Sequence, residues 1–347
     1  MITGYIEGYY GVELSWKERD SIISKLHQSG FNTYFYCPKE DPYHRVKWKD
    51  DYPIDWIEDF KKFKSNADSV GIDIIFGISP GASLELKDFE HLERKIGTFK
   101  ELSIENFCIL FDDIPKEKEQ FSLHRRVLEL CLEKFPNIKL SCVPSQYCKN
   151  MVEKSNNDYL TELDKVDIRI PFFWTGNQVI TSNYSNNNVD SWKALFREDR
   201  DLIIWDNTFA NDYCVPKIVM QNFDDFFSID DKKVFGFLLN ASGIELIDLM
   251  AIEILDNTLK ENHRTLEDIL KDKGFPKEFI NLSHFFKINI SSSFSDDEKK
   301  DLDFLLWNWN GKIKKFFYPY LHQLNQIFNE TDQNELNGLK KRFRVKE

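Results

Sequence analysis

The sequence lacks any segment that would hold it in a membrane or in a disulfide scaffold. None of its apolar runs approaches the roughly 18 consecutive residues of a membrane-spanning helix, and the N-terminus has no basic segment followed by an apolar stretch, the pattern of a secretory signal. The six cysteines show no paired CxxC spacing and are too sparse for a disulfide framework. We therefore expect a cytoplasmic protein with reduced cysteines and no membrane partner.

The sequence also lacks an excess of basic charge and the common motifs of several enzyme classes. It has 46 Lys and Arg against 58 Asp and Glu, a formal net charge of −12, and no basic stripe, which argues against a general nucleic-acid surface. Its seven histidines show no HExxH or other metal-ligand spacing, and no GxSxG elbow marks an acyl-transfer nucleophile. We predict no metal ion, no cofactor and no nucleic-acid partner.

What the chain does have is a long alternation of apolar, strand-like segments with amphipathic helical ones. With 347 residues and 41% hydrophobic content, it can bury the core of one large domain and supply a small second unit. Helices are predicted over segments such as 16–29, 54–70 and 121–135. Strands are predicted near residues 2–8, 31–37, 72–78, 104–111, 138–143, 166–173, 201–205 and 233–239. Eight βα units over about 250 residues predict an α/β fold, the (β/α)8 TIM barrel.

The rest of the chain follows a different pattern. An open doubly wound sheet is disfavoured, because no GxGxxG turn follows the first strand and the repeat continues to eight. From about residue 259 the alternation stops, and helices are predicted over 296–306 and 311–328, the first with Ser295 as N-cap before an acidic turn. We expect a catalytic barrel over residues 1–258 and a small C-terminal helical domain over residues 259–347.

Two adjacent carboxylates follow the fourth predicted strand. The apolar run 107–111 is long enough for a buried strand, and it delivers Asp112 and Asp113 at its end. In α/β barrels the chemistry lies at the carboxyl ends of the strands, so this pair predicts an acid/base site. The competing interpretation is a polar turn after a core strand, because Asp is also a common turn residue.

Polar and aromatic residues follow most of the other predicted strands as well. Such a set suits a sugar, whose C–H face packs on aromatic rings and whose hydroxyls need carboxylate, amide or ammonium partners. The segments concerned are Glu7-Gly8-Tyr9-Tyr10-Gly11, Pro38-Lys39-Glu40-Asp41, Pro144-Ser145-Gln146-Tyr147, Trp174-Thr175-Gly176, Trp205-Asp206-Asn207, Ala210-Asn211-Asp212-Tyr213 and Asn240.

Each of these residues taken singly has an ordinary structural explanation. Trp205 could be core, Lys39 a solvated loop charge and Asn240 a turn residue, so their joint placement carries the argument. His44 is interpreted as a structural loop histidine. The aromatic residues of the C-terminal part, Trp307, Trp309, Phe316, Phe317 and Tyr318, have helical spacing and are expected in a core.

At these residues the chain resembles the O-GlcNAcase family, glycoside hydrolase family 84, which also contains hyaluronidase-like bacterial enzymes. The resemblance is ordered along the sequence and covers nearly all of residues 1–250. Its motifs are Gly4 to Gly11, Asn32 to Asp41, Tyr43-His44-Arg45, Ile78-Ser79-Pro80-Gly81, Leu110 to Ile114, Trp174-Thr175-Gly176, and Trp205-Asp206-Asn207 through Asn211-Asp212-Tyr213. It implies a retaining β-N-acetylglucosaminidase in which the substrate's acetamido carbonyl is the nucleophile and an oxazoline forms.

The resemblance also implies roles for individual residues. Asp112 would orient the acetamido N–H, and Asp113 would protonate the leaving oxygen and later activate water. Neighbouring carboxylates in a partly desolvated pocket do not both ionise freely, which supports such a division. The residues implied to hold the sugar are Gly8, Lys39, Asn207, Asp212 and Asn240; Tyr147 and Trp205 would form the acetamide wall, and Tyr10 and Val179 its edge.

Several alternatives remain open at this point. The substrate could be a GlcNAc-bearing glycoprotein or a glycosaminoglycan or cell-wall oligosaccharide, and a barrel that only binds the sugar is a third interpretation. Glu40 departs from the family pattern, where many relatives have Asp, without removing a predicted catalytic group. The helical domain after residue 259 is a candidate contact of a homodimer, or it caps the barrel.

Overall fold

A computed structural model describes residues 1–81, 84–113, 119–154, 158–197, 200–223, 227–230, 232–262, 264–291 and 293–346. The chain divides into two compact units. The first comprises residues 1–207 and 226–243, and the second comprises residues 208–225 and 244–347. The domain boundary expected at residue 258 stays a prediction, and each unit is described separately below.

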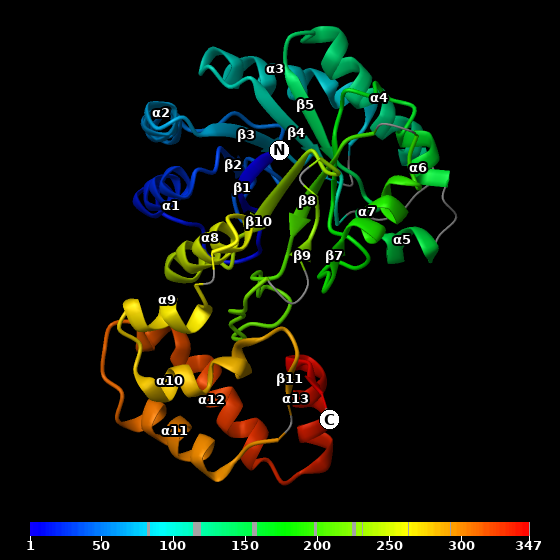
Figure 1. Ribbon diagram of the computed structural model, residues 1–347. Helices are drawn as coiled ribbons and strands as arrows, with labels where there is room; N and C mark the ends of the chain where they lie inside the picture. Colours follow the sequence, from blue (N-terminus) through cyan, green and yellow to red (C-terminus); the bar gives the residue numbers. More distant parts are fainter. Residues whose placement is uncertain are drawn as a thin grey trace. The chain divides into compact units, whose positions relative to one another are not determined.

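The first unit is built on a closed barrel of eight parallel strands, as predicted (Figure 1). Along the barrel wall the order is β1-β10-β8-β6-β5-β4-β3-β2, so the first strand pairs with the last, with Ile6 opposite Asn240. The strands are β1 (Ile2–Glu7), β2 (Thr33–Tyr36), β3 (Asp73–Ile78), β4 (Asn106–Leu110), β5 (Lys139–Val143), β6 (Phe172–Trp174), β8 (Leu202–Asp206) and β10 (Gly236–Asn240).

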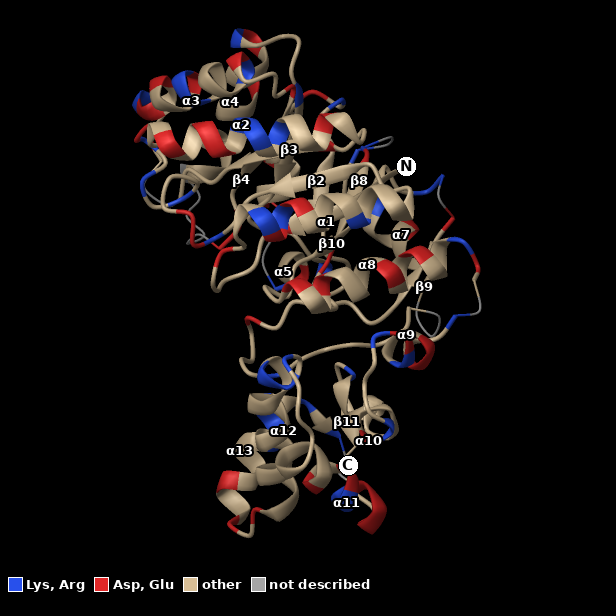
Figure 2. Ribbon diagram, turned by 90° about the vertical axis from the view of Figure 1, so that its left-hand side faces the viewer, with Lys and Arg blue, Asp and Glu red and all other residues tan. Residues whose placement is uncertain are grey.

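Helices surround these strands in the first unit. Figure 2 shows charged residues mainly on helices and loops, whereas the barrel strands carry few. Ser15 caps α1 with a capping box to Glu18, which satisfies two backbone donors at the helix start. The helices are α1 (Trp16–Ser29), α2 (Ile54–Ser69), η1 (Leu86–Asp88), α3 (Phe89–Glu101), α4 (Glu119–Lys134), α5 (Lys149–Glu153), α6 (Asp158–Leu163) and α7 (Asn186–Lys193), and β7 (Tyr184–Ser185) pairs with β9 (Phe227–Ser228).

The strands are buried on both faces, which explains their continuous apolar runs. One face fills the barrel interior, where Phe35, Phe173 and Trp205 meet with ring centroids 5.0–5.9 Å apart. The other face packs under the helices, for example Phe76 against Phe99 of α3 at 3.6 Å. The described cysteines are all free and buried.

Strand β6 is much shorter than the predicted segment 166–173. The reason is the side chain of Arg200, which is 1% exposed and supplies the donors that a strand ladder would otherwise provide. Its guanidinium donates to the backbone carbonyls of residues 164, 166, 167 and 170 at 2.7–3.1 Å, and to the carboxylate of Asp164 at 2.7 Å. Val166 and Ile170 are therefore buried in a loop rather than in a strand, whereas Ile168 is exposed.

The second unit is mainly helical, in keeping with the predicted change of pattern. Ser295 caps α11 by accepting from the backbone N–H of Glu298, as predicted. Of the aromatic residues expected in a core, Phe317 is fully buried, whereas Trp307 is 65% exposed. The elements are α8 (Glu245–Leu259), α9 (Leu266–Asp272), α10 (Lys277–Asn281), η2 (Ser283–Phe286), β11 (Ile290–Ser291), α11 (Asp296–Trp307), α12 (Lys314–Asn329), α13 (Gln333–Phe343) and β12 (Val345–Lys346).

The segment 208–223 is bound to the rest of the second unit through a buried lysine, Lys217. The Lys217 ammonium is fully buried and donates to the carbonyls of Ile288 and Phe343 at 2.5 and 2.7 Å. Arg342 donates to the carbonyl of Val215 at 2.7 Å. Within the described part of the chain, no helix is long and apolar enough to cross a membrane.

Buried histidines make the stability of the first unit depend on pH. His124 stacks on Phe111 with ring centroids 3.9 Å apart, and burial lowers its pKa to about 3. The pKa of His44 is also lowered to about 3, by burial and then by Lys39. A histidine whose folded pKa lies below its usual 6.5 stabilises the fold fully above pH 6.5, and this contribution is lost as the pH falls toward 3.

We predict that His124→Gln flattens the loss of stability between pH 6.5 and pH 5. Each buried histidine contributes up to about 1.4 kcal/mol per pH unit in this window, and the substitution removes one of them. The measurement is the free energy of unfolding in urea at several pH values. His27→Gln, at an exposed position of α1, is the matched control and should keep the wild-type slope; an equal slope in His124→Gln would contradict the prediction.

Candidate active site

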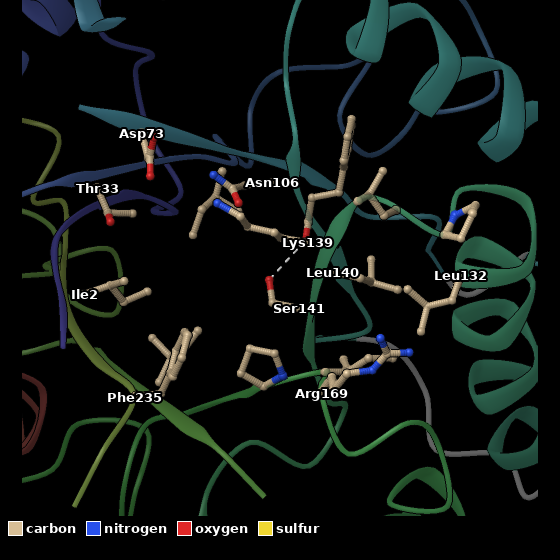
Figure 3. A pocket seen from close by; sticks show the side chains of 17 residues that line it. Ile2, Thr33, Asp73, Asn106, Leu132, Lys139, Leu140, Ser141, Arg169 and Phe235 are labelled. Carbon is tan, nitrogen blue, oxygen red and sulfur yellow. Dashed lines mark hydrogen bonds between the residues drawn. The ribbon is translucent and has the colours of Figure 1, made fainter. Parts of the chain in front are cut away.

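The two ends of the barrel differ in what they offer a ligand. A cavity of about 500 Å³ lies at the amino ends of the strands, where Ile2, Thr33, Asn106 and Ser141 contribute to its wall (Figure 3). The lining is mainly aliphatic, and Ser141 donates to the carbonyl of Phe107 at 3.1 Å. The predicted site residues instead follow the carboxyl ends of the strands, where barrel enzymes carry their chemistry.

Asp112 is a buried carboxylate with only one of its oxygens paired. The residue is 7% exposed, and its Oδ2 atom accepts a hydrogen bond from the Lys39 ammonium, to which it is also ion-paired. Its Oδ1 atom is buried and accepts no hydrogen bond from the described residues. A buried carboxylate oxygen normally has a donor, so this atom is positioned to receive one from a ligand.

Asp113 faces a different environment although it is the next residue. Its φ of 56° lies in the left-handed region, which is uncommon for a residue other than glycine. The side chain is exposed, and Oδ2 accepts from the Tyr10 hydroxyl at 2.8 Å while Oδ1 accepts from the Tyr147 hydroxyl at 3.1 Å. The adjacent acids therefore have distinct partners, one a buried cation and the other two tyrosines.

Lys39 joins the acid pair to an aromatic wall. Its ammonium lies 6.0 Å from the ring centroid of Trp205, within the range of a cation–π contact. Burial lowers the pKa of Lys39, but the attraction of Asp112 outweighs it, so the net shift is upward and the ammonium is charged. The pKa of Tyr147 is raised by burial and by the nearby Asp113, so its hydroxyl stays a donor at neutral pH.

Two amides continue the wall on the other side of Trp205. The indole N–H of Trp205 donates to Asn207 Oδ1 at 2.8 Å, and Asn240 donates to the same oxygen at 2.9 Å. Asn207 in turn donates to the backbone carbonyl of Val179 at 2.8 Å, and the backbone N–H of Gly8 donates to Asn240 Oδ1 at 3.1 Å. These hydrogen bonds hold the side-chain amides of Asn207 and Asn240 at the carboxyl ends of β8 and β10.

Hydrogen bonds, an ion pair, a cation–π contact and the peptide bond between Asp112 and Asp113 thus connect the predicted site residues of the first unit into one network. Asp212 belongs to the second unit, where it lies partly exposed in a turn. The network runs from Tyr10 and Tyr147 through Asp113, Asp112, Lys39, Trp205, Asn207 and Asn240 to Gly8 and Val179.

The sequence analysis missed one member of this network, Arg45, and gave no role to its neighbour Asp41. Arg45 donates through Nη1 to the Tyr10 hydroxyl, a contact between residues 35 positions apart. Asp41 is buried and structural, since it accepts from the hydroxyls of Tyr36 and Tyr52 at 2.8 and 2.9 Å. His44 is fully buried with Nδ1 3.0 Å from the carbonyl of Gly77, in keeping with a structural role.

Glu7, at the end of β1, also has a structural partner rather than a place in the network. It is fully buried and forms a bidentate ion pair with Arg19 of α1 at 2.8 and 2.9 Å. Its Oε2 accepts in addition from the Tyr34 hydroxyl at 2.6 Å. The strand alternation explains this, because the side chain of the preceding Ile6 points into the barrel core.

Comparison with known proteins places the chain in a family. Residues 3–255 match the family model described as beta-N-acetylglucosaminidase. The curated proteins named Protein O-GlcNAcase from Rattus norvegicus and Mus musculus are each 30% identical to it over 279 residues, which cover 75% of this chain. The chain spans only 30% of the length of these relatives.

A solved structure named CpGH84B is similar in fold. Its TM-score is 0.71 at 23% sequence identity, and the match covers 99% of this chain and 66% of the other. Fold and matches together define a glycoside hydrolase built on a (β/α)8 barrel. Because the family model covers most of the sequence, the chain belongs to the β-N-acetylglucosaminidase family, glycoside hydrolase family 84, as its motifs predicted.

The close approach of Gly8 to the ring of Trp205 can be tested by substitution. A Cβ atom at position 8 would lie 2.4 Å from Cζ2 of Trp205, whose ring is held by the barrel core. We predict that Gly8→Ala lowers the free energy of unfolding by about 1–3 kcal/mol, the usual effect of overpacking, and displaces the indole. Urea unfolding measures the first effect and near-UV circular dichroism the second.

The matched control is Gly97→Ala in the interior of α3, where a Cβ atom meets nothing within 4 Å. Alanine is favoured over glycine in a helix by up to about 1 kcal/mol, so this variant should be at least as stable as wild type. A Gly8→Ala protein as stable as Gly97→Ala would contradict the predicted contact.

Proposed function

We propose that the chain is a retaining β-N-acetylglucosaminidase that removes O-linked GlcNAc from Ser or Thr of proteins by substrate-assisted catalysis. The observation that carries this proposal is the unpaired, buried Oδ1 atom of Asp112, whose other oxygen is held by Lys39. An acetamido N–H is a donor of the kind that this oxygen requires. The names of the curated relatives support a protein substrate.

The remaining network residues suit the rest of the sugar. The rings of Trp205 and Tyr147 offer apolar surface for the acetamide methyl and the C–H face of the ring. Lys39, Asn207 and Asn240 offer donors and acceptors for hydroxyls, and by the family resemblance Asp212 binds a hydroxyl as well. Tyr10 and Val179 are both about 40% exposed and would form the edge of the pocket.

The first chemical step forms an oxazoline on the substrate. The acetamido carbonyl oxygen attacks the anomeric carbon, the bond from that carbon to the leaving oxygen breaks, and Asp113 gives its proton to the leaving oxygen. Asp112 holds the N–H as positive charge develops on the acetamido group. Holding the carbonyl beside the anomeric carbon makes the attack intramolecular, which lowers the entropic barrier.

The second step returns the enzyme to its starting state. Asp113, now a carboxylate, takes a proton from water as the water oxygen attacks the anomeric carbon, and the oxazoline ring opens to the acetamide. Two displacements at one carbon retain the β configuration. The spacing rule for paired carboxylates does not apply here, because the second carboxylate is not the nucleophile.

The test is hydrolysis of fluorogenic β-N-acetylglucosaminides with a good and a poor leaving group. We expect wild type to cleave both, and Asp112→Asn to lose about 10²–10⁴-fold on both. Asp113→Asn should lose as much on the poor leaving group and much less on the good one, which needs little proton donation. Asp73→Asn, an exposed position at the amino end of β3, is the matched control.

Several outcomes would contradict the proposal. They are an inactive wild type that binds N-acetylglucosamine in calorimetry, an Asp113→Asn variant that cleaves the poor leaving group as fast as wild type does, and equal cleavage of the matching glucoside, which has no acetamido group. Activity on oligosaccharides with none on a glycopeptide would move the substrate class to glycans. Cytoplasmic residence and a homodimer contact through residues 259–347 stay predictions of the sequence.

A further inference from the structure

Asp113 is reached by a chain of hydrogen bonds that begins at a cation outside the predicted site. Arg45 is half-buried and donates through Nη1 to the hydroxyl oxygen of Tyr10. The same hydroxyl donates to Asp113 Oδ2 at 2.8 Å. The Tyr10 hydroxyl therefore lies between a guanidinium and a carboxylate, and the cation polarises its O–H bond toward the carboxylate.

Arg45 follows a backbone segment that is held in place by hydrogen bonds. The carboxylate of Asp41 accepts from the backbone N–H groups of Tyr43 and His44 at 2.8 and 3.3 Å, and it is held in turn by two tyrosine hydroxyls. The ring of His44 is fully buried against the carbonyl of Gly77. Arg45 follows directly, so its Cα position is set by the hydrogen bonds of the two preceding residues.

Tyr10 is the more exposed partner of this pair. It lies on the loop after β1, with glycines at positions 8 and 11, and it is 40% exposed. The Arg45 guanidinium lies 5.3 Å from the centroid of its ring and also bonds its hydroxyl. The fixed cation therefore orients the exposed tyrosine, rather than the reverse.

The two oxygens of Asp113 are not equivalent. Oδ2 has the shorter bond, 2.8 Å, from a hydroxyl that Arg45 also holds. Oδ1 has the longer bond, 3.1 Å, from Tyr147, whose hydroxyl has no second hydrogen bond within the described residues. A leaving-group oxygen that needs a place on this carboxylate displaces the weaker partner, which is Tyr147.

We propose that Arg45 is a positioning residue for the acid/base step: through Tyr10 it holds Oδ2 of Asp113 and leaves Oδ1 to face the leaving-group oxygen. This inference rests on the proposed function. In the first step the proton passes from Oδ1 to the leaving oxygen as the glycosidic bond breaks. The carboxylate that results is stabilised by the Tyr10 hydroxyl, and Oδ1 takes the proton of water in the second step.

The arrangement has a definite consequence for the pH dependence of the reaction. A hydroxyl polarised by Arg45 favours the ionised form of Asp113. The other charged groups near this acid are Lys39 and Asp112. In the step that kcat/KM reports, Asp113 acts as the acid, so removal of Arg45 moves the alkaline limb of the profile of kcat/KM against pH toward higher pH.

The experiment compares the pH profiles of wild type, Arg45→Met, Arg45→Lys and Tyr10→Phe on the poor leaving group. We expect Arg45→Met to move the alkaline limb upward and to lower kcat/KM at neutral pH on the order of tenfold, the effect of one charged hydrogen bond. Arg45→Lys keeps the charge and should restore the wild-type limb. Tyr10→Phe should reproduce the shift, and the double variant Arg45→Met/Tyr10→Phe should add little to either single one.

Lys47→Met is the matched control, since it removes an exposed positive charge two positions away that contacts the ring of Tyr43 instead. A crystal structure of Arg45→Met supplies a readout that needs no turnover, in which the Tyr10 hydroxyl should lie beyond hydrogen-bond distance of Asp113. An alkaline limb that stays in place in Arg45→Met, or a Tyr10–Asp113 bond that persists, would overturn the inference while active wild type upholds the proposed function. An inactive wild type would refute the proposed function and the role of Arg45 with it.

Discussion

The buried ammonium of Lys39 lies near the carboxyl ends of the barrel strands, among apolar and aromatic side chains. The geometry of the site follows from the way in which this positive charge is neutralised. A buried ion needs a partner, and removing one member of a buried pair costs on the order of 3–5 kcal/mol. Asp112 is that partner, so its Oδ2 atom is committed to the fold. Because the ammonium also faces Trp205, the same pair fixes the distance between the acids and the aromatic wall.

Because Oδ2 of Asp112 is bound to Lys39, the Oδ1 atom, which has no donor among the described residues, indicates where a ligand would bind. Asp112 cannot turn to satisfy Oδ1 without giving up Lys39, so a donor must come from outside the network. Asp113 is under no such constraint, because its side chain, on a residue with left-handed backbone, accepts from two neutral tyrosine hydroxyls instead of a buried cation. A single change of backbone conformation between neighbours therefore separates a fixed carboxylate from one that can exchange partners and protons.

The architecture could be predicted from the sequence because each unit of the barrel repeats the same pattern. Buried strands such as 107–110 give unbroken apolar runs, and capped amphipathic segments such as 16–29 give helices, so both signals are local. Strand β6 was overestimated because Val166 and Ile170 are buried without strand pairing, and only the structure shows that Arg200 donates to their carbonyl groups.

The candidate site was predictable as a set of residues but not as a network. The motifs brought Asp112, Lys39 and Trp205 to the correct end of the barrel, and their contacts agree with the grouping. The part played by Arg45 could not be predicted, because an arginine after a histidine in a loop has no local signal. It depends on Tyr10, which is 35 positions away, and on a loop geometry set by buried groups.

Barrel closure also has a consequence for how the protein is made. The backbone N–H of Gly8 and the side chain of Asn240 are partners across 232 positions, and β1 and β10 pair in register beside them. During synthesis the first of these strands leaves the ribosome long before the last, and contacts of such sequence separation form slowly. A nascent chain therefore carries the acid pair well before Asn240 is made, and the network becomes complete only when translation has passed β10.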